Sequence, residues 1–146
     1  MQRQGLYRPS TKTPYTPGYE GSGVVEKFSE NITDLKENDR VIVFGSSGMW
    51  KEVVLVPRSN VFKIPDNMTY EDAAGLLVNY ITAYQMLFRM ANLKEGDSIL
   101  IQMAAGGVGT AAIQLCRTIP NVTIFGTASL SKHDVLRLLL LLIYLY

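Results

Sequence analysis

The sequence predicts an α/β fold class with a β-rich part at its beginning, and three observations support this prediction. Short β-branched runs separated by glycine, proline and asparagine fill the first half of the chain. Apolar residues then recur at helical spacing from about residue 67. Finally, the glycine-rich stretch "MAAGGVG" stands between an apolar run and a second helical segment. The 146 residues suffice for one ordinary domain and a fragment of another.

The β-rich part contains four candidate strands, which we place at residues 21–28, 39–44, 50–57 and 60–64. Their spacing predicts a small barrel or sandwich that ends at about residue 66.

Residues 67–93 predict connecting helices. Thr69 and Asp72 have the spacing of a capping box, which indicates that a helix begins there. Gly75, together with the β-branched stretch "VNYIT", predicts that the helical segment divides into two pieces.

Residues 94–134 predict a strand, a helix and a second strand. The apolar run "DSILIQM" is typical of a buried strand, the glycine loop opens a helix, and "NVTIFGTAS" provides the next strand and its loop. Such units form parallel strand pairs with a right-handed crossover. We therefore expect the first strand-helix-strand unit of a dinucleotide-binding domain.

The glycine loop matches the dinucleotide fingerprint with Ala104, Gly106 and Gly109 at its three glycine places. The second place must lack a side chain so that main-chain amides approach a pyrophosphate, and the third lets the helix lie close to the strand. The alternative is a tight strand-to-helix turn with no ligand. A P-loop is excluded, because Thr110 and Ala111 follow the last glycine where that motif needs lysine and a hydroxyl residue.

The end of the second strand favours NADP over NAD. No acidic residue precedes Asp134, whereas Ser129, Lys132 and His133 could donate to a 2′-phosphate. The alternative is a solvated polar loop of the same composition.

Charge, cysteine content and hydropathy argue against several other classes of protein. The net charge of +1 is spread along the chain, so we expect no nucleic-acid partner. The single cysteine, Cys116, suits the reducing cytosol and is predicted to pack as a small apolar group. No apolar run reaches the length of a membrane-spanning helix, so a cytoplasmic location is expected.

The motifs "RQGLY", "TPGYEGSGVVE", "NDRVIVF", "GLLVNYITAYQMLF" and "MAAGGVGTAAIQLCRT" together resemble the zinc-independent quinone-oxidoreductase branch of the medium-chain dehydrogenase/reductase superfamily. The resemblance implies a partial GroES-like β domain at 1–66 and the start of a Rossmann domain at 94–134. It also implies NADP(H) as cofactor and a small-molecule quinone or reactive carbonyl as hydride acceptor. Tyr19 stands where zinc-bearing relatives have a histidine ligand, so no metal is expected.

The same resemblance assigns site residues. Tyr7 is the expected proton or hydrogen-bond donor to the acceptor, with a half-buried anchoring tyrosine as the alternative. Asn79 and Thr82 are expected near the nicotinamide and its ribose, with capping of a helix break as the alternative. The main chain of the loop is expected to bind the pyrophosphate, and Ser129 and Lys132 the 2′-phosphate; the loop residues are Ala105, Gly106, Gly107, Val108 and Gly109.

The sequence departs from the family at both ends, so we expect a truncated form. Family members begin well before "RQGLY", and the apolar tail at 135–146 has no counterpart in them. We interpret the tail as an artefact or splice product, with a short apolar helix capping the sheet or a membrane-touching segment as alternatives. A parallel pair of strands would then keep open edges. The competing hypotheses are a peripheral, non-catalytic protein at vesicle or mitochondrial outer membranes and an inactive, unstable fragment; a homodimer is expected of the full-length parent.

Overall fold

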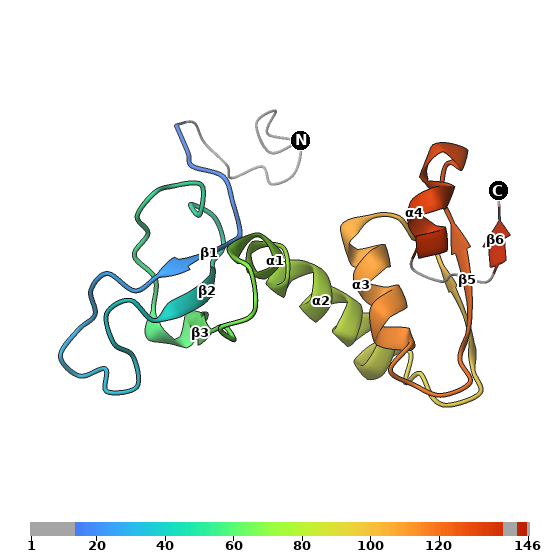
Figure 1. The fold of residues 1–146 in the computed structure, drawn as a ribbon, viewed down its shortest axis with the longest axis horizontal. Coiled ribbons are helices and arrows are strands. Elements are labelled where there is room, and N and C mark those ends of the chain that lie inside the picture. The colour runs from blue at the N-terminus through green and yellow to red at the C-terminus, as the bar shows by residue number, and fades with distance from the viewer. Residues whose placement is uncertain (1–13, 139–142, 146) are drawn as a thin grey trace. The chain divides into compact units, whose positions relative to one another are not determined.

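The computed structural model describes residues 14–138 and 143–145 (Figure 1). The chain forms two compact units, of which the first ends at Leu77 and the second begins at Val78. The helical segment predicted as a connection at 67–93 is therefore divided between the two units.

The first unit contains a three-stranded antiparallel sheet of β1 (Glu20–Val24), β2 (Arg40–Phe44) and β3 (Val61–Lys63), in that order. Successive side chains of β2 enter different hydrophobic clusters, because alternate residues of a strand point to opposite faces. Val41 packs with Val25, Leu35 and Val61, whereas Ile42 packs with the residues of the following helix. The described residues of the first unit form this one sheet rather than the expected barrel or sandwich.

The prediction of a strand at residues 50–57 is wrong. Residues 51–53 bend and residues 54–57 have no regular structure. Val53 keeps 68% and Leu55 100% of its surface exposed. An apolar, β-branched run becomes a strand only where a neighbouring strand pairs with its backbone, and no described strand lies beside this one.

Two helices follow, and the break predicted at Gly75 is confirmed. Helix α1 (Tyr70–Ala74) begins at Thr69, whose hydroxyl accepts a hydrogen bond from the amide of Asp72 at 3.1 Å. Gly75 is its C-cap. Helix α2 (Leu77–Tyr84) continues into a π-helical turn at Gln85–Met90, so the "VNYIT" stretch remains helical.

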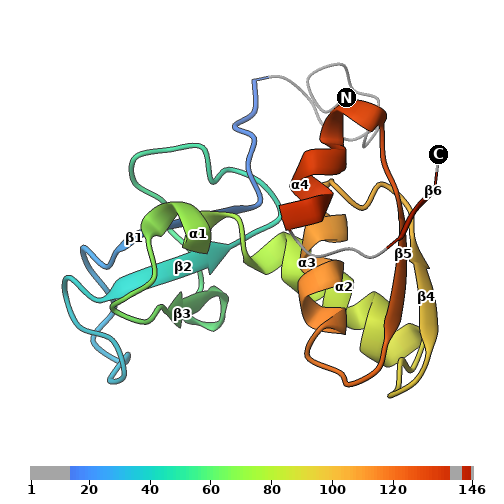
Figure 2. The ribbon, with the colours of Figure 1, turned by 45° about the vertical axis from the view of Figure 1, so that its right-hand side comes forward.

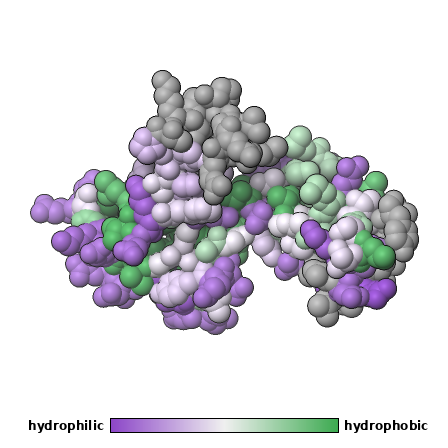
Figure 3. All heavy atoms as spheres, turned by 90° about the horizontal axis from the view of Figure 1, so that it is seen from above, coloured by the Kyte–Doolittle hydropathy of each residue, from purple (hydrophilic) through white to green (hydrophobic). Residues whose placement is uncertain are grey.

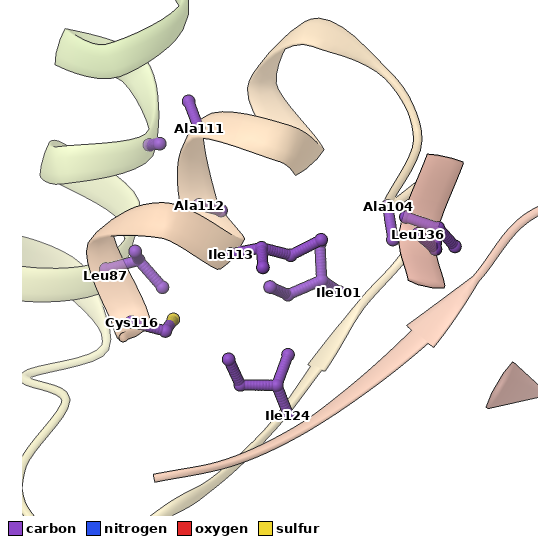
Figure 4. Packing of buried hydrophobic residues seen from close by; sticks show 10 residues of the cluster. Leu87, Ile101, Ala104, Ala111, Ala112, Ile113, Cys116, Ile124 and Leu136 are labelled. Carbon is purple, nitrogen blue, oxygen red and sulfur yellow. The ribbon is translucent and has the colours of Figure 1, made fainter. Parts of the chain in front are cut away.

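The second unit contains the predicted parallel pair of strands. Strand β4 (Ser98–Ile101) leads through the glycine loop into helix α3 (Gly107–Cys116), and strand β5 (Thr123–Thr127) returns beside β4 in parallel. Ile113 of α3 points toward Ile101 and Ile124 of the strands (Figure 4). Cys116 is fully buried in this core, and burial raises the pKa of its thiol to about 11, which confirms its predicted apolar packing.

Described residues of the apolar tail form part of the second unit. Helix α4 (His133–Leu138) places Leu136, which has no exposed surface, in the same core as α3. Strand β6 (Ile143–Leu145) then pairs in parallel with β5, giving the order β4-β5-β6 (Figure 2). The expectation of a sheet limited to two strands is therefore wrong. Every described helix is too short or too polar to cross a membrane.

Candidate functional site

The glycine loop is fixed to the carboxyl end of β5. The N–H of Ala104 donates to the carbonyl oxygen of Thr127 at 2.9 Å, and the N–H of Met103 donates to the hydroxyl of the same threonine at 3.2 Å. Met103 adopts a positive φ of 53°, which is uncommon for a residue with a side chain. The sequence interpretation did not include Thr127, although a hydroxyl residue at the carboxyl end of the second strand is well placed to anchor this loop.

The first turn of α3 presents main-chain donors without a side-chain cap. Gly106 is the N-cap of α3. Its N–H donates to the carbonyl oxygen of Met103 at 2.8 Å, and its carbonyl oxygen accepts from the N–H of Thr110 at 2.8 Å. The N–H groups of Gly107, Val108 and Gly109 have no acceptor within the helix, because the partners four residues earlier lie outside it. Together with the helix dipole, these donors form a site suited to an anion such as a phosphate.

The glycines at the second and third fingerprint places lie against the backbone of the loop. A Cβ on Gly109 would approach the carbonyl oxygen of Met103 to 2.5 Å and the Cα of Ala104 to 2.7 Å. A Cβ on Gly106 would lie 3.1 Å from the same Met103 oxygen. Gly109 therefore permits the close approach of helix and loop that the fingerprint requires of its third glycine.

Helix α2 contributes a polar side chain to the loop. A Cβ on Gly107 would lie 2.7 Å from Oδ1 of Asn79, so the amide of Asn79 packs directly against the first residue of α3. Thr82 follows three residues later on the same side of α2, with an exposed side chain. Asn79 is thus brought to the predicted site. Tyr7 lies outside the described residues.

The predicted 2′-phosphate residues lie just after β5. Ser129 and Lys132 are exposed, and the backbone N–H of Lys132 donates to the carbonyl oxygen of Ser129 at 2.9 Å. Since the carboxyl ends of parallel neighbouring strands meet at one edge of a sheet, this turn and the glycine loop lie at the same edge. His133 differs from the prediction, because its ring is buried and Nε2 lies 3.2 Å from the carbonyl oxygen of Ala128.

Two charged residues of the first unit, Asp39 and Arg40, make contacts that stabilise the fold. Asp39 pairs with the ammonium of Lys63 at 2.7 Å, and this bond together with one from the backbone N–H of Lys36 lowers the pKa of the Asp39 carboxyl. Arg40 donates to the carbonyl of Asp66 at 2.7 Å and lies over the ring of Tyr70 at 4.6 Å. Within residues 14–138 and 143–145, no three His, Cys, Asp or Glu side chains form a group that could hold a metal ion.

Comparison with protein families defines the class of the first unit. Residues 1–66 match the family model described as the alcohol dehydrogenase GroES-like domain. This domain and the parallel strands with their glycine loop are the two parts of the fold predicted from the sequence.

Individual relatives identify the family. The chain is 58% identical over 137 residues to the rat synaptic vesicle membrane protein VAT-1 homolog, and 37% identical over 127 residues to human quinone oxidoreductase. These matches cover 94% and 86% of this chain but 34% and 38% of the relatives, so the chain spans about a third of their length.

Comparison with solved structures supports the same family. The human VAT-1 homolog-like protein matches 99% of this chain and 46% of its own with a TM-score of 0.93 and 46% identity. A mycobacterial protein solved in complex with NADPH matches 98% of this chain and 44% of its own with a TM-score of 0.87 and 28% identity. The chain belongs to the medium-chain dehydrogenase/reductase superfamily.

Proposed function

We propose that this chain forms part of an NADPH-dependent oxidoreductase that transfers a hydride to a quinone or reactive carbonyl compound without zinc. The observation that carries the proposal is the uncapped start of α3 behind a loop in which glycine is sterically required. The likeness to quinone oxidoreductase and to a structure solved with NADPH supports the cofactor and the reaction class.

The residues of the second unit fit a dinucleotide. The N–H groups of Gly107, Val108 and Gly109 donate to the pyrophosphate, while Ala105 and Gly106 supply the backbone that shapes the loop. The exposed Ser129 and Lys132 bind the 2′-phosphate, which a lysine attracts as a point charge. When bound, NADPH supplies the hydride itself.

The remaining residues orient the reactants. Asn79, which packs against the loop, and Thr82, one helical turn further along α2, hold the ribose next to the nicotinamide. Tyr7 donates a hydrogen bond to the acceptor oxygen, and this assignment stays a prediction from the sequence. A positioned donor polarises a carbonyl in place of a metal ion, and Tyr19 stands where zinc-bearing relatives have a ligand.

Cofactor binding by the purified chain tests the proposal. We expect NADPH fluorescence to rise and its emission to shift to the blue in a saturable titration, because the nicotinamide leaves water. Quinone-dependent loss of NADPH absorbance then tests turnover. A chain that is folded by circular dichroism and leaves NADPH fluorescence unchanged would overturn the proposal.

A peripheral, non-catalytic role at a membrane surface is the second candidate, which the naming of relatives as synaptic vesicle membrane proteins favours. Flotation with liposomes tests it. Because Leu136 belongs to the core, the deletion variant should remove only residues 139–146 and keep α4, and circular dichroism should first show that it stays folded without β6. Flotation that this deletion abolishes would support the role, and recovery in the lipid-free fraction alone would contradict it.

A further inference from the structure

Met103 connects the glycine loop to the start of α3. Its carbonyl oxygen accepts a hydrogen bond from the N–H of Gly106 at 2.8 Å. A Cβ on Gly106 would lie 3.1 Å from the same oxygen, and a Cβ on Gly109 would lie 2.5 Å from it. The first turn of α3, whose N–H groups the proposed function assigns to the pyrophosphate, is therefore positioned by the backbone of Met103.

The backbone conformation of Met103 is one that its surroundings must maintain. Its φ of 53° lies in the left-handed region, where a residue with a side chain is uncommon. Hydrophobic atoms reach the surface of both units in the view of Figure 3. Met103 itself is 78% exposed, so its side chain packs against little of the described chain. Its conformation therefore depends on the hydrogen bonds of its backbone.

Thr127 provides the acceptor for the N–H of Met103. Its Oγ1 accepts this hydrogen bond at 3.2 Å, and its carbonyl oxygen accepts the N–H of Ala104 at 2.9 Å. Thr127 is the half-buried last residue of β5, a strand that pairs with β4 up to Gly126. One residue of the sheet thus holds two consecutive residues of the loop, one through its side chain and one through its main chain.

We propose that Thr127 is a positioning residue for dinucleotide binding: its hydroxyl oxygen holds Met103 in the conformation that presents the start of α3 to the pyrophosphate. This inference rests on the proposed function. In this role Thr127 does not touch the cofactor and acts through Met103. A loop that is ordered before the cofactor arrives loses less conformational freedom on binding, which increases affinity.

The turn after β5 is held by other hydrogen bonds. The N–H of Lys132 donates to the carbonyl oxygen of Ser129 at 2.9 Å, and Nε2 of His133 lies 3.2 Å from the carbonyl oxygen of Ala128. The hydroxyl of Thr127 takes part in neither contact. Its loss should therefore weaken NADPH and NADH by the same factor, because both cofactors carry the pyrophosphate and only NADPH carries the 2′-phosphate.

Thr127→Val tests the proposal, because valine keeps a β-branched side chain that suits a strand and removes the acceptor. The main-chain hydrogen bond from Ala104 remains, so we expect a partial loss of binding. Fluorescence titrations should show both cofactors bound about tenfold more weakly. Thr127→Ser keeps the hydroxyl and should bind both cofactors within about twofold of the wild type. Thr123→Val is the matched control, since it makes the same change at the amino end of the same strand, and it should bind as the wild type does.

Urea denaturation separates positioning from a purely structural role. A purely structural role would lower the urea midpoint and leave the cofactor affinity of the folded chain unaltered. We expect Thr127→Val to be folded by circular dichroism and to have the weaker affinity all the same. If this variant does not fold, Thr127→Ala removes the same hydroxyl and takes its place in the comparison with Thr127→Ser.

The titrations distinguish a failure of this inference from a failure of the proposed function. A folded wild-type chain that binds neither cofactor would overturn the proposed function, and the role of Thr127 with it. Wild-type binding that Thr127→Val leaves unaltered would overturn the role of Thr127 alone. Equal weakening by Thr127→Val and Thr127→Ser would contradict a role of the hydroxyl, and a loss confined to NADPH would contradict its action through the pyrophosphate.

Discussion

The side-chain amide of Asn79 on α2 lies against Gly107, the first residue of α3. A methyl group on Gly107 would approach Oδ1 of Asn79 to 2.7 Å and its Cγ and Nδ2 to 3.0 Å. The helix that precedes the sheet therefore contacts the N-terminus of the helix that follows the glycine loop. The absence of a side chain at position 107 makes room for Asn79, a residue that the sequence assigns to the cofactor.

This contact predicts coupling between the two positions. Gly107→Ala should weaken NADPH binding about tenfold, because Asn79 or the start of α3 must move. In the Asn79→Ala background the same substitution should cost less, giving a coupling energy of about 1 kcal/mol in a double-mutant cycle of NADPH titrations. Additive effects of the two substitutions would show that the contact does not influence the site.

Gly109 provides a second prediction, on stability. Gly109→Ala should lower the free energy of unfolding by about 1–3 kcal/mol, because the new methyl group would meet the backbone of Met103 and Ala104, which cannot rotate away. Gly23→Ala is the control, since a Cβ there meets nothing within 4 Å. Urea denaturation measures both. Equal, small losses would mean that α3 and the loop have room to separate.

Lys132 provides a third prediction, on cofactor preference. Lys132→Glu should weaken NADPH about tenfold and leave NADH nearly unchanged, because only NADPH carries the 2′-phosphate. Lys94→Glu reverses an exposed charge of the same unit away from the turn and controls for general electrostatic repulsion. If Lys132→Glu altered the two affinities equally, the phosphate assignment would fail.

The ion pair of Asp39 predicts how stability depends on pH. The folded-state pKa of Asp39 is lowered by Lys63 first and by the backbone N–H of Lys36 second, and that of Asp34 is lowered by Arg58. A lowered folded-state pKa stabilises the fold above the unfolded value of about 3.9, and the contribution is lost as the pH falls below it. Urea midpoints of the wild type should therefore decrease below about pH 4.

Asp39→Asn should make this decrease shallower, because the amide does not titrate. Asp34→Asn should do the same through its pair with Arg58, and the double variant should depend on pH least. A decrease as steep in the double variant as in the wild type would assign the acid sensitivity to other groups.

Local chemistry explains which parts of the fold the sequence predicts well. The break at Gly75 and the cap at Thr69 are set by neighbouring residues, so they can be read from the chain alone. The parallel pair β4 and β5 is equally accessible, because both strands are short apolar runs on either side of a helical segment. The requirement for glycine at position 109 can also be predicted from the sequence, because the backbone that a Cβ would meet belongs to Met103 and Ala104, six and five residues earlier.

Properties that depend on distant partners are missed. Val53 and Leu55 have the composition of a strand, but pairing requires a neighbour that composition does not reveal. Strand β6 is not predicted from the sequence, because it lies in a leucine-rich tail without the alternation of apolar and polar residues that is typical of a strand. The sequence predicts His133 as a possible phosphate donor, but its ring lies at the start of α4 with Nε2 next to the carbonyl oxygen of Ala128.

Amide chemical shifts of the ¹⁵N-labelled chain, recorded while NADPH is added, test most directly whether the start of α3 binds the pyrophosphate. The largest changes should occur at Gly107, Val108 and Gly109, whose N–H groups become donors to phosphate, and NADH should produce the same changes at these three residues. Saturable changes confined to other residues, with these three amides unmoved, would contradict the account.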